Sequence, residues 1–115
     1  QSIIRDEIHR RKLCLFLRLD APKCVQSNTQ LVYTGLRRPV NLTCFMHDGN
    51  PSKLNFTWQL PTGNIRPGHP LNSTGTSLIV LPDQLDHFGS ILCRAQNELD
   101  FTGECRINLI MGGIP

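Results

Sequence analysis

Three short segments of the sequence alternate apolar and polar residues with the period of two that is typical of β-strands. They are residues 40–44, 54–58 and 91–95. Each segment places one residue of a special kind in phase with its apolar neighbours: Cys44, Trp58 and Cys93. Because successive side chains of a strand point to opposite faces, we expect all three residues to enter one core. Two cysteines that enter a core from facing sheets can form a disulfide there, and an indole can fill the space beside the sulfurs.

Further strand and turn signals follow from residue 23 onward. The other predicted strands are residues 30–34, 77–81 and 104–110. Their predicted inward positions are Leu78, Val80, Ile107 and Leu109. Residues 61–76 are rich in Pro, Gly, Asn and Ser, which predicts loops with at most one weak edge strand. About seven short strands separated by turns predict an all-β, antiparallel β-sandwich with a single core.

The segment around the second core cysteine carries a resemblance to a known family. Residues 88–97 read FGSILCRAQN, which resembles the corresponding strand of intermediate-set domains of the immunoglobulin superfamily. The resemblance covers residues 21–111 and implies an immunoglobulin-like antiparallel β-sandwich with a bridge from Cys44 to Cys93 beside Trp58. The family's tyrosine two residues before the second cysteine is replaced by Ile91, and its aspartate six residues before is His87. We therefore expect packing to hold this corner in place of a hydrogen bond worth about 1 kcal/mol.

The outer cysteines carry a narrower resemblance. The motifs Ala21-Pro22-Lys23-Cys24, residues 39–44 and Gly103-Glu104-Cys105, followed by residues 112–115, are similar to internal immunoglobulin domains of Sidestep-like cell-surface proteins of invertebrates. This resemblance implies a second bridge, from Cys24 near the first strand to Cys105 on the last. Cys14 is then left over, and it either pairs within a neighbouring domain or is an unpaired thiol.

The ends of the chain are assigned by composition. Residues 1–20 are predicted to be a poorly ordered N-terminal segment or the end of a preceding domain, residues 21–111 the immunoglobulin-like domain, and residues 112–115 a linker. Residues 13–19 are apolar, and they are either the last strand of a preceding domain or an accidental apolar patch. No apolar run is long enough to span a bilayer, so we expect any membrane anchor to lie outside this sequence.

Cysteine content and sequons predict an extracellular setting. Five cysteines in 115 residues favour an oxidising compartment, because cytosolic thiols are kept reduced. Three sequons agree with this, and their predicted glycosylation sites are Asn41, Asn55 and Asn72. Cys44 and His47 have the spacing of metal ligands, but no second pair completes a tetrahedral site, so neither a metal nor another cofactor is expected.

Charge and motifs argue against two other classes of function. The net charge of +3 is mildly basic, the basic residues are mostly scattered, and only 6% of residues are aromatic, so a nucleic-acid partner is not expected. No catalytic motif occurs, and the four histidines are isolated among residues typical of loops. We therefore expect that the protein is not an enzyme.

The resemblance implies a module of a cell-surface adhesion or guidance receptor. Its expected partners are other immunoglobulin-superfamily proteins, homophilic or heterophilic, and neighbouring immunoglobulin domains of the same chain. Two alternatives stay open: a structural module of a secreted matrix protein, and a secreted recognition protein of the immune type. The full-length sequence would separate them, because a receptor needs a membrane-spanning segment that a matrix protein lacks.

The sequons lead to two opposed hypotheses about the surface. Asn55 and Asn41 are predicted to point outward from opposite sheets, so glycans on both would hinder both broad faces and leave the domain as a spacer. Asn72 is predicted to lie in a loop. If some sequons are unused, the outward residues of the second-cysteine strand form a candidate contact face: Leu92, Arg94 and Gln96.

Overall fold

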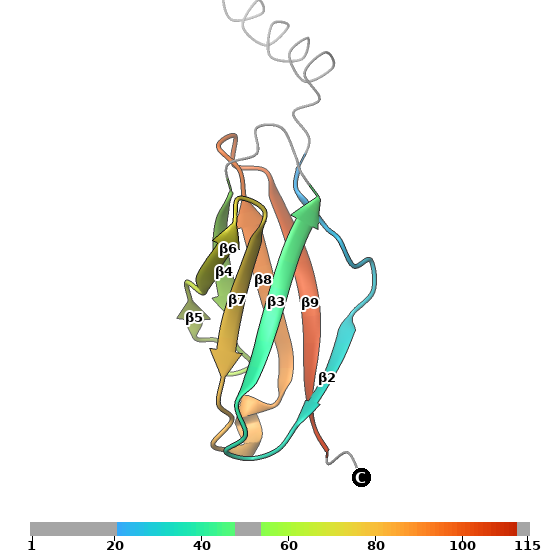
Figure 1. Ribbon diagram of the computed structural model, residues 1–115, viewed down its shortest axis with the longest axis vertical. Coiled ribbons are helices and arrows are strands. Elements are labelled where there is room, and N and C mark those ends of the chain that lie inside the picture. Colours follow the sequence, from blue (N-terminus) through green and yellow to red (C-terminus); the bar gives the residue numbers. More distant parts are fainter. Residues whose placement is uncertain (1–20, 48–53, 113–115) are drawn as a thin grey trace, which may run out of the picture.

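Two β-sheets pack face to face in the computed structural model, which describes residues 21–47 and 54–112 (Figure 1). The four-stranded sheet has the order β1 (Lys23–Cys24), β3 (Val40–His47), β7 (Gly75–Val80) and β6 (His69–Asn72). The five-stranded sheet has the order β2 (Gln30–Thr34), β9 (Thr102–Met111), β8 (Gly89–Gln96), β4 (Asn55–Gln59) and β5 (Ile65–Arg66). The predicted sandwich is thereby confirmed. The predictions for residues 1–20, including Cys14 and the apolar run 13–19, lie outside the described residues, and so does most of the linker 112–115.

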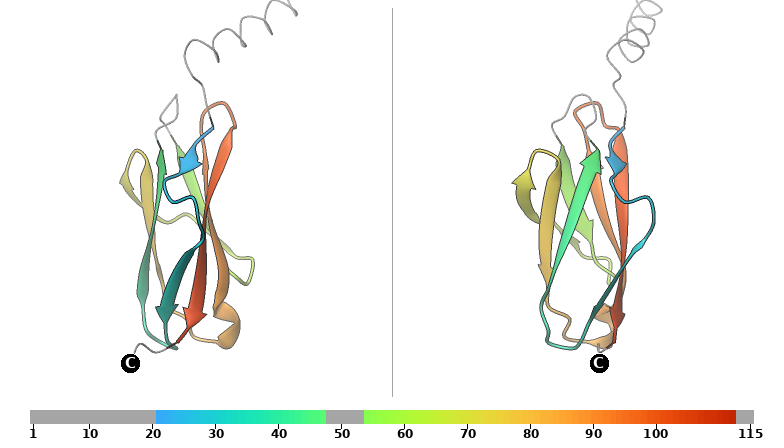
Figure 2. Two further views of the ribbon diagram at one scale, coloured as in Figure 1. Left: turned by 90° about the vertical axis from the view of Figure 1, so that its right-hand side faces the viewer. Right: turned by 45° about the vertical axis from the view of Figure 1, so that its right-hand side comes forward.

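One pair of strands in this antiparallel sandwich is parallel, which the sequence did not predict. Strand β2 runs parallel to β9, with Gln30 opposite Ile107 and Thr34 opposite Met111. The chain keeps its direction as it leaves β1 on one sheet and reaches β2 on the other, and β9 runs the same way (Figure 2). An early strand split between two sheets therefore pairs antiparallel with β3 in its first half and parallel with β9 in its second.

The segment 61–76 contains more strand than its composition predicts. It forms β5 at the edge of one sheet, β6 at the edge of the other, and the start of β7. Every residue of β5 and β6 is exposed. An edge strand with no buried side does not need alternating apolar residues, which is why the sequence pattern gave no signal.

The core lies between the sheets and is built from the predicted inward positions. Its fully enclosed members include Trp58, Ile91, Cys93 and Ala95, each with 0% of its surface exposed. Leu42, Leu78, Ile107 and Leu109 pack in the same cluster. The alternation of buried and exposed residues along β3 and β8 is continuous, so period-two reasoning placed the core side of these strands correctly.

The corner before β8 is held by more than packing. A short 3-10 helix, η1 (Leu85–His87), precedes the strand. The Nδ1 atom of His87 accepts a hydrogen bond of 2.9 Å from the backbone N–H of Asp83. The expectation of packing alone is therefore corrected: Ile91 is buried where the family has tyrosine, and the imidazole two residues before β8 ties the corner to the preceding backbone.

Candidate recognition surface and disulfide pair

Two disulfides join the sheets side by side, as the sequence and its resemblance predicted. Cys44 on β3 is bonded to Cys93 on β8, with 6.4 Å between their Cα atoms. Cys24 on β1 is bonded to Cys105 on β9, with 5.1 Å between their Cα atoms. Cys93 and Cys105 are register partners on adjacent strands. The two covalent links therefore lie side by side and join four strands, β1 to β9 and β3 to β8.

Trp58 completes a buried row across the five-stranded sheet. It is the register partner of Cys93 on the side opposite Cys105. Gly68 passes over the indole with φ of 75°, and a Cβ atom at Gly68 would lie 2.5 Å from the indole Nε1. The crossing between β5 and β6 can therefore approach Trp58 closely only because residue 68 has no side chain.

The two disulfides differ in their access to solvent. Cys44 and Cys93 are 1% and 0% exposed, whereas Cys24 is half-buried. A cavity of about 80 Å³ lies beside the outer bridge, lined by Cys24 and Cys105 among others. The inner bridge is sealed within the core, and the outer bridge faces a small opening at the edge of the sandwich.

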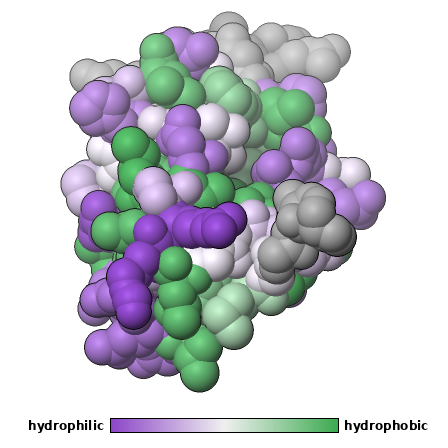
Figure 3. Space-filling model, turned by 60° about the horizontal axis from the view of Figure 1, so that its bottom comes forward, coloured by the Kyte–Doolittle hydropathy of each residue, from purple (hydrophilic) through white to green (hydrophobic). Residues whose placement is uncertain are grey.

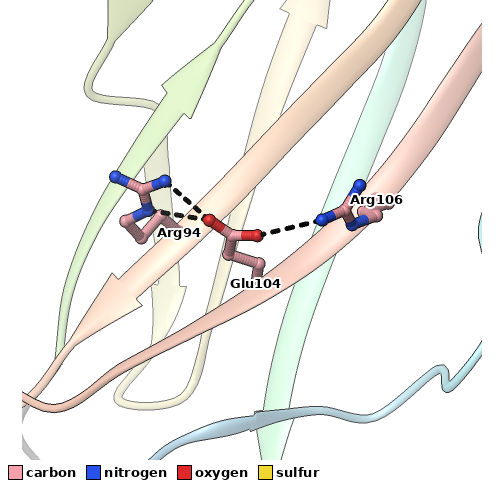
Figure 4. A network of polar contacts seen from close by, with 3 residues as sticks. All are labelled: Arg94, Glu104 and Arg106. Carbon is pink, nitrogen blue, oxygen red and sulfur yellow. Dashed lines mark hydrogen bonds and ion pairs between the residues drawn. The ribbon is translucent and has the colours of Figure 1, made fainter.

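The outer face of the five-stranded sheet carries the predicted contact residues, but two of them are engaged within the chain. Arg94 contacts Glu104 Oε2 through Nε at 3.1 Å and through Nη2 at 2.6 Å (Figure 4). Arg106 Nη2 lies 3.7 Å from the other carboxylate oxygen of Glu104. Gln96 donates a hydrogen bond of 2.9 Å to Asp100. The face therefore presents an alternating charge pattern across β8 and β9, with Leu92 half-buried beside it.

Sequence reasoning missed the apolar part of this face. Leu31 and Tyr33 on β2 are 55% and 50% exposed, and they lie opposite Asn108 and Ile110 of β9. They join the face only because β2 pairs with β9, a pairing that was not predicted. The sequence did contain a signal for exposed apolar side chains on β2. Leu31, Val32 and Tyr33 are consecutive apolar residues, whereas a half-buried strand needs an apolar residue only at every second position.

The three sequon asparagines are all exposed, and glycosylation of each stays a prediction. Asn55 begins β4 opposite Gln96, the last residue of β8, so it lies at one end of the five-stranded face. Leu31 and Tyr33 lie toward the other end, where β9 finishes. A glycan on Asn55 therefore leaves part of that face uncovered, which weakens the case for a pure spacer. Asn72 ends β6 and does not lie in a loop, and its Oδ1 accepts a hydrogen bond from the N–H of Thr74.

The described residues contain no cluster of three or more side chains suited to a metal ion. Cys44 has no free thiolate to offer a metal, because it is bonded to Cys93. Within these same residues, no helix has the length and apolar character needed to cross a membrane.

A buried tryptophan beside an inter-sheet disulfide, enclosed by two facing sheets, defines the immunoglobulin fold. Similarity to solved structures agrees with this assignment. Titin domains I67–I69 match with a TM-score of 0.62 and 21% identity over 80% of this chain, which spans 33% of that three-domain fragment. The first immunoglobulin domain of mouse SynCAM 2 matches with a TM-score of 0.57 and 16% identity, covering 83% of this chain and 98% of that one.

A complex of two immunoglobulin proteins is also among the similar structures. Dpr11 IG1 bound to DIP-gamma matches with a TM-score of 0.59 and 10% identity, covering 80% of this chain and 51% of that one. No protein-family model and no curated protein sequence matches the chain. At these identities, the similarity establishes the fold of this protein.

Proposed function

We propose that this chain is a non-catalytic, extracellular immunoglobulin module of a cell-surface adhesion or guidance protein of the Sidestep-like kind. Its partners are other immunoglobulin-superfamily proteins. The recognition surface is the outer face of the five-stranded sheet, from β2 across β9 to β8. Two disulfides in a small domain support the extracellular setting, because such bonds persist in oxidising compartments.

The observation that carries the proposal is the composition of that face. Tyr33 and Leu31 expose about half of their surfaces beside the charged row of Arg94, Glu104 and Arg106. Aromatic anchors beside arginines are typical of the centres of protein interfaces, and arranged charges select the partner and its orientation. Similar structures include the RIG-5 IG1 homodimer and Dpr11 IG1 bound to DIP-gamma, which supports an immunoglobulin domain as the partner class.

The test is a binding screen with matched surface variants. The glycosylated protein, presented as a multivalent fusion, is screened against a panel of immunoglobulin ectodomains and against itself. Tyr33→Ala and Arg106→Glu should each weaken a detected interaction at least tenfold, because they remove an anchor and reverse a charge on the proposed face. Leu71→Ser is the control, since Leu71 is 48% exposed but lies on β6, at the edge of the other sheet. Equal binding by all variants would place the contact elsewhere.

A structural role in a secreted matrix protein is the second candidate function. The similarity to a tandem of three titin immunoglobulin domains favours it, because that fragment is an array of such modules. In this case the screen should detect no partner, and Tyr33→Ala should leave assembly of the full-length protein unchanged.

A further inference from the structure

The outer face of the four-stranded sheet carries an exposed apolar residue directly beside a sequon. Ile79 on β7 is 64% exposed, and its register partner on β3 is Asn41. Both side chains lie on the outer face, so their Cβ atoms are separated by about 5 Å, as in any directly opposed antiparallel pair. Thr43, the third residue of the sequon, is exposed on the same face. The folded domain can therefore accommodate a glycan on Asn41.

A groove lies beside this pair. Its volume is about 370 Å³, and its lining includes Asn41, Ser77, Ile79 and the crossing residues 66–69. The groove exists because β6 begins at His69, opposite Ser77, so the part of β7 that carries Ile79 has no strand beside it on that edge. Viewed with the lower end of the sandwich brought forward, the surface shows hydrophobic patches interrupted by polar side chains (Figure 3).

We propose that this groove binds the first sugar of the protein's own N-linked glycan, which is attached at Asn41. The first N-acetylglucosamine packs its apolar face and acetamido methyl against Ile79. Its hydroxyl groups lie within reach of the polar groups that line the groove, Arg66 and His69. A glycan on Asn41 is the expected occupant, because Asn41 lines the groove and is also the residue to which the glycan is attached.

A sugar bound in this groove explains why an isoleucine is exposed near the end of β7. Covering its side chain removes apolar surface from water, which stabilises the folded state. The attached sugar also blocks lateral pairing at the uncovered edge of β7, a position where an unprotected strand invites association with another chain. The four-stranded face is thereby closed to partners, and recognition is left to the five-stranded face. The inference rests on the extracellular setting in the proposed function.

The test is a double-mutant cycle on protein secreted from a eukaryotic host. Asn55→Gln and Asn72→Gln leave Asn41 as the one sequon, and endoglycosidase trimming leaves a single N-acetylglucosamine. Loss of the sugar by Asn41→Gln should lower the melting temperature by about 4 °C, a shift typical of one small contact in a domain of this size. In the Ile79→Ser background the same loss should have no effect. Ile65→Ser is the matched control, being 59% exposed on the other sheet, and it should leave the sugar's effect unchanged.

A second readout locates the sugar directly. Nuclear Overhauser contacts between the acetamido methyl and the Ile79 methyl groups are expected in the trimmed glycoprotein. An unmodified Asn41, a sugar without such contacts, or a thermal effect that survives Ile79→Ser would each overturn the proposal. A dimer of the glycosylated protein that Ile79→Ser dissociates in sedimentation would also overturn it, because the groove would then receive a second copy. None of these results depends on the binding screen, so the two proposals can fail separately.

Discussion

Cys93 and Cys105 face each other across β8 and β9, although each is bonded to a different cysteine on the opposite sheet. Directly opposed residues in an antiparallel pair have Cβ atoms about 5 Å apart. The sandwich therefore holds four sulfur atoms in two adjacent links. The two bridges are unequal in access, because the outer one borders a cavity and the inner one is buried in the core.

The first prediction concerns the order in which the bridges are reduced. Thiol–disulfide exchange requires that the attacking thiolate reach a sulfur atom. Limiting reductant under native conditions should therefore open Cys24–Cys105 well before Cys44–Cys93, which is at most 1% exposed. Alkylation of the freed thiols followed by peptide mass spectrometry measures the order. Simultaneous release of all four thiols would mean that the bridges are lost only on global unfolding.

The second prediction concerns Gly103, which precedes the outer bridge on β9. A Cβ atom at this position would clash with the backbone oxygen of Pro22. Gly103→Ala must therefore push the start of β1 away from β9, and we expect a loss of about 2 kcal/mol in the free energy of unfolding. Reduction of Cys24–Cys105 should also become faster, since β1 carries Cys24. Denaturant unfolding and the alkylation assay measure the two effects.

Gly63→Ala provides the matched control for this substitution. Nothing lies within 4 Å of a Cβ atom at Gly63, although its φ of 94° makes any side chain costly there. It should lower stability modestly through backbone strain and leave the rate of reduction unchanged. Equal acceleration in both variants would indicate general loosening and not a local displacement of β1.

The core residues of this domain could be predicted from the sequence, because buried and exposed side chains alternate with a period of two along its main strands. Leu42, Trp58 and Cys93 sit on strands with one buried side, and alternation alone orients such strands. The same alternation places Cys44 and Cys93 inward, and so predicts the bridge between them. The outer bridge needed a family resemblance, because Cys24 lies in a strand of only two residues with no period to read.

Only part of the recognition face could be predicted from the sequence, for physical reasons. Leu92 and Arg94 were placed on it from the alternation of β8, but Leu31 and Tyr33 belong to it only through the parallel pairing of β2. Which sheet an early strand joins depends on contacts distant in sequence, and local pattern does not encode them. The contact from Glu104 to Arg94 likewise follows from the register between β8 and β9, whereas Arg106 lies two residues further along the same strand as Glu104. The position of Asn41 beside Ile79 follows from the register between β3 and β7.

The third prediction separates packing from hydrogen bonding at Trp58. Within residues 21–47 and 54–112, the buried indole Nε1 has no hydrogen-bond partner. Trp58→Phe should therefore cost only the volume that is lost, about 1–2 kcal/mol of unfolding free energy, and Trp58→Leu should cost more, about 3 kcal/mol. Chemical denaturation of both variants measures the difference. A phenylalanine variant as unstable as the leucine variant would show that the indole N–H makes a bond important to stability.

The fourth prediction concerns the charged row on the recognition face. Glu104 contacts two arginines, but the side chain of Arg94 is 51% exposed and that of Arg106 is 65% exposed. Ion pairs this open to water are screened by salt, and each is worth less than about 1 kcal/mol. Glu104→Gln should therefore change the free energy of unfolding by less than that amount, and the change should shrink further in high salt.

The same substitution should matter more for binding than for folding. Glu104→Gln leaves two arginine charges without their carboxylate on the face, which alters the potential that an approaching partner meets. We expect the association rate to change severalfold at low salt, with the melting temperature almost constant. Surface plasmon resonance at two salt concentrations, alongside thermal unfolding, makes this comparison. A large loss of stability without any change in association would assign the row a structural role instead.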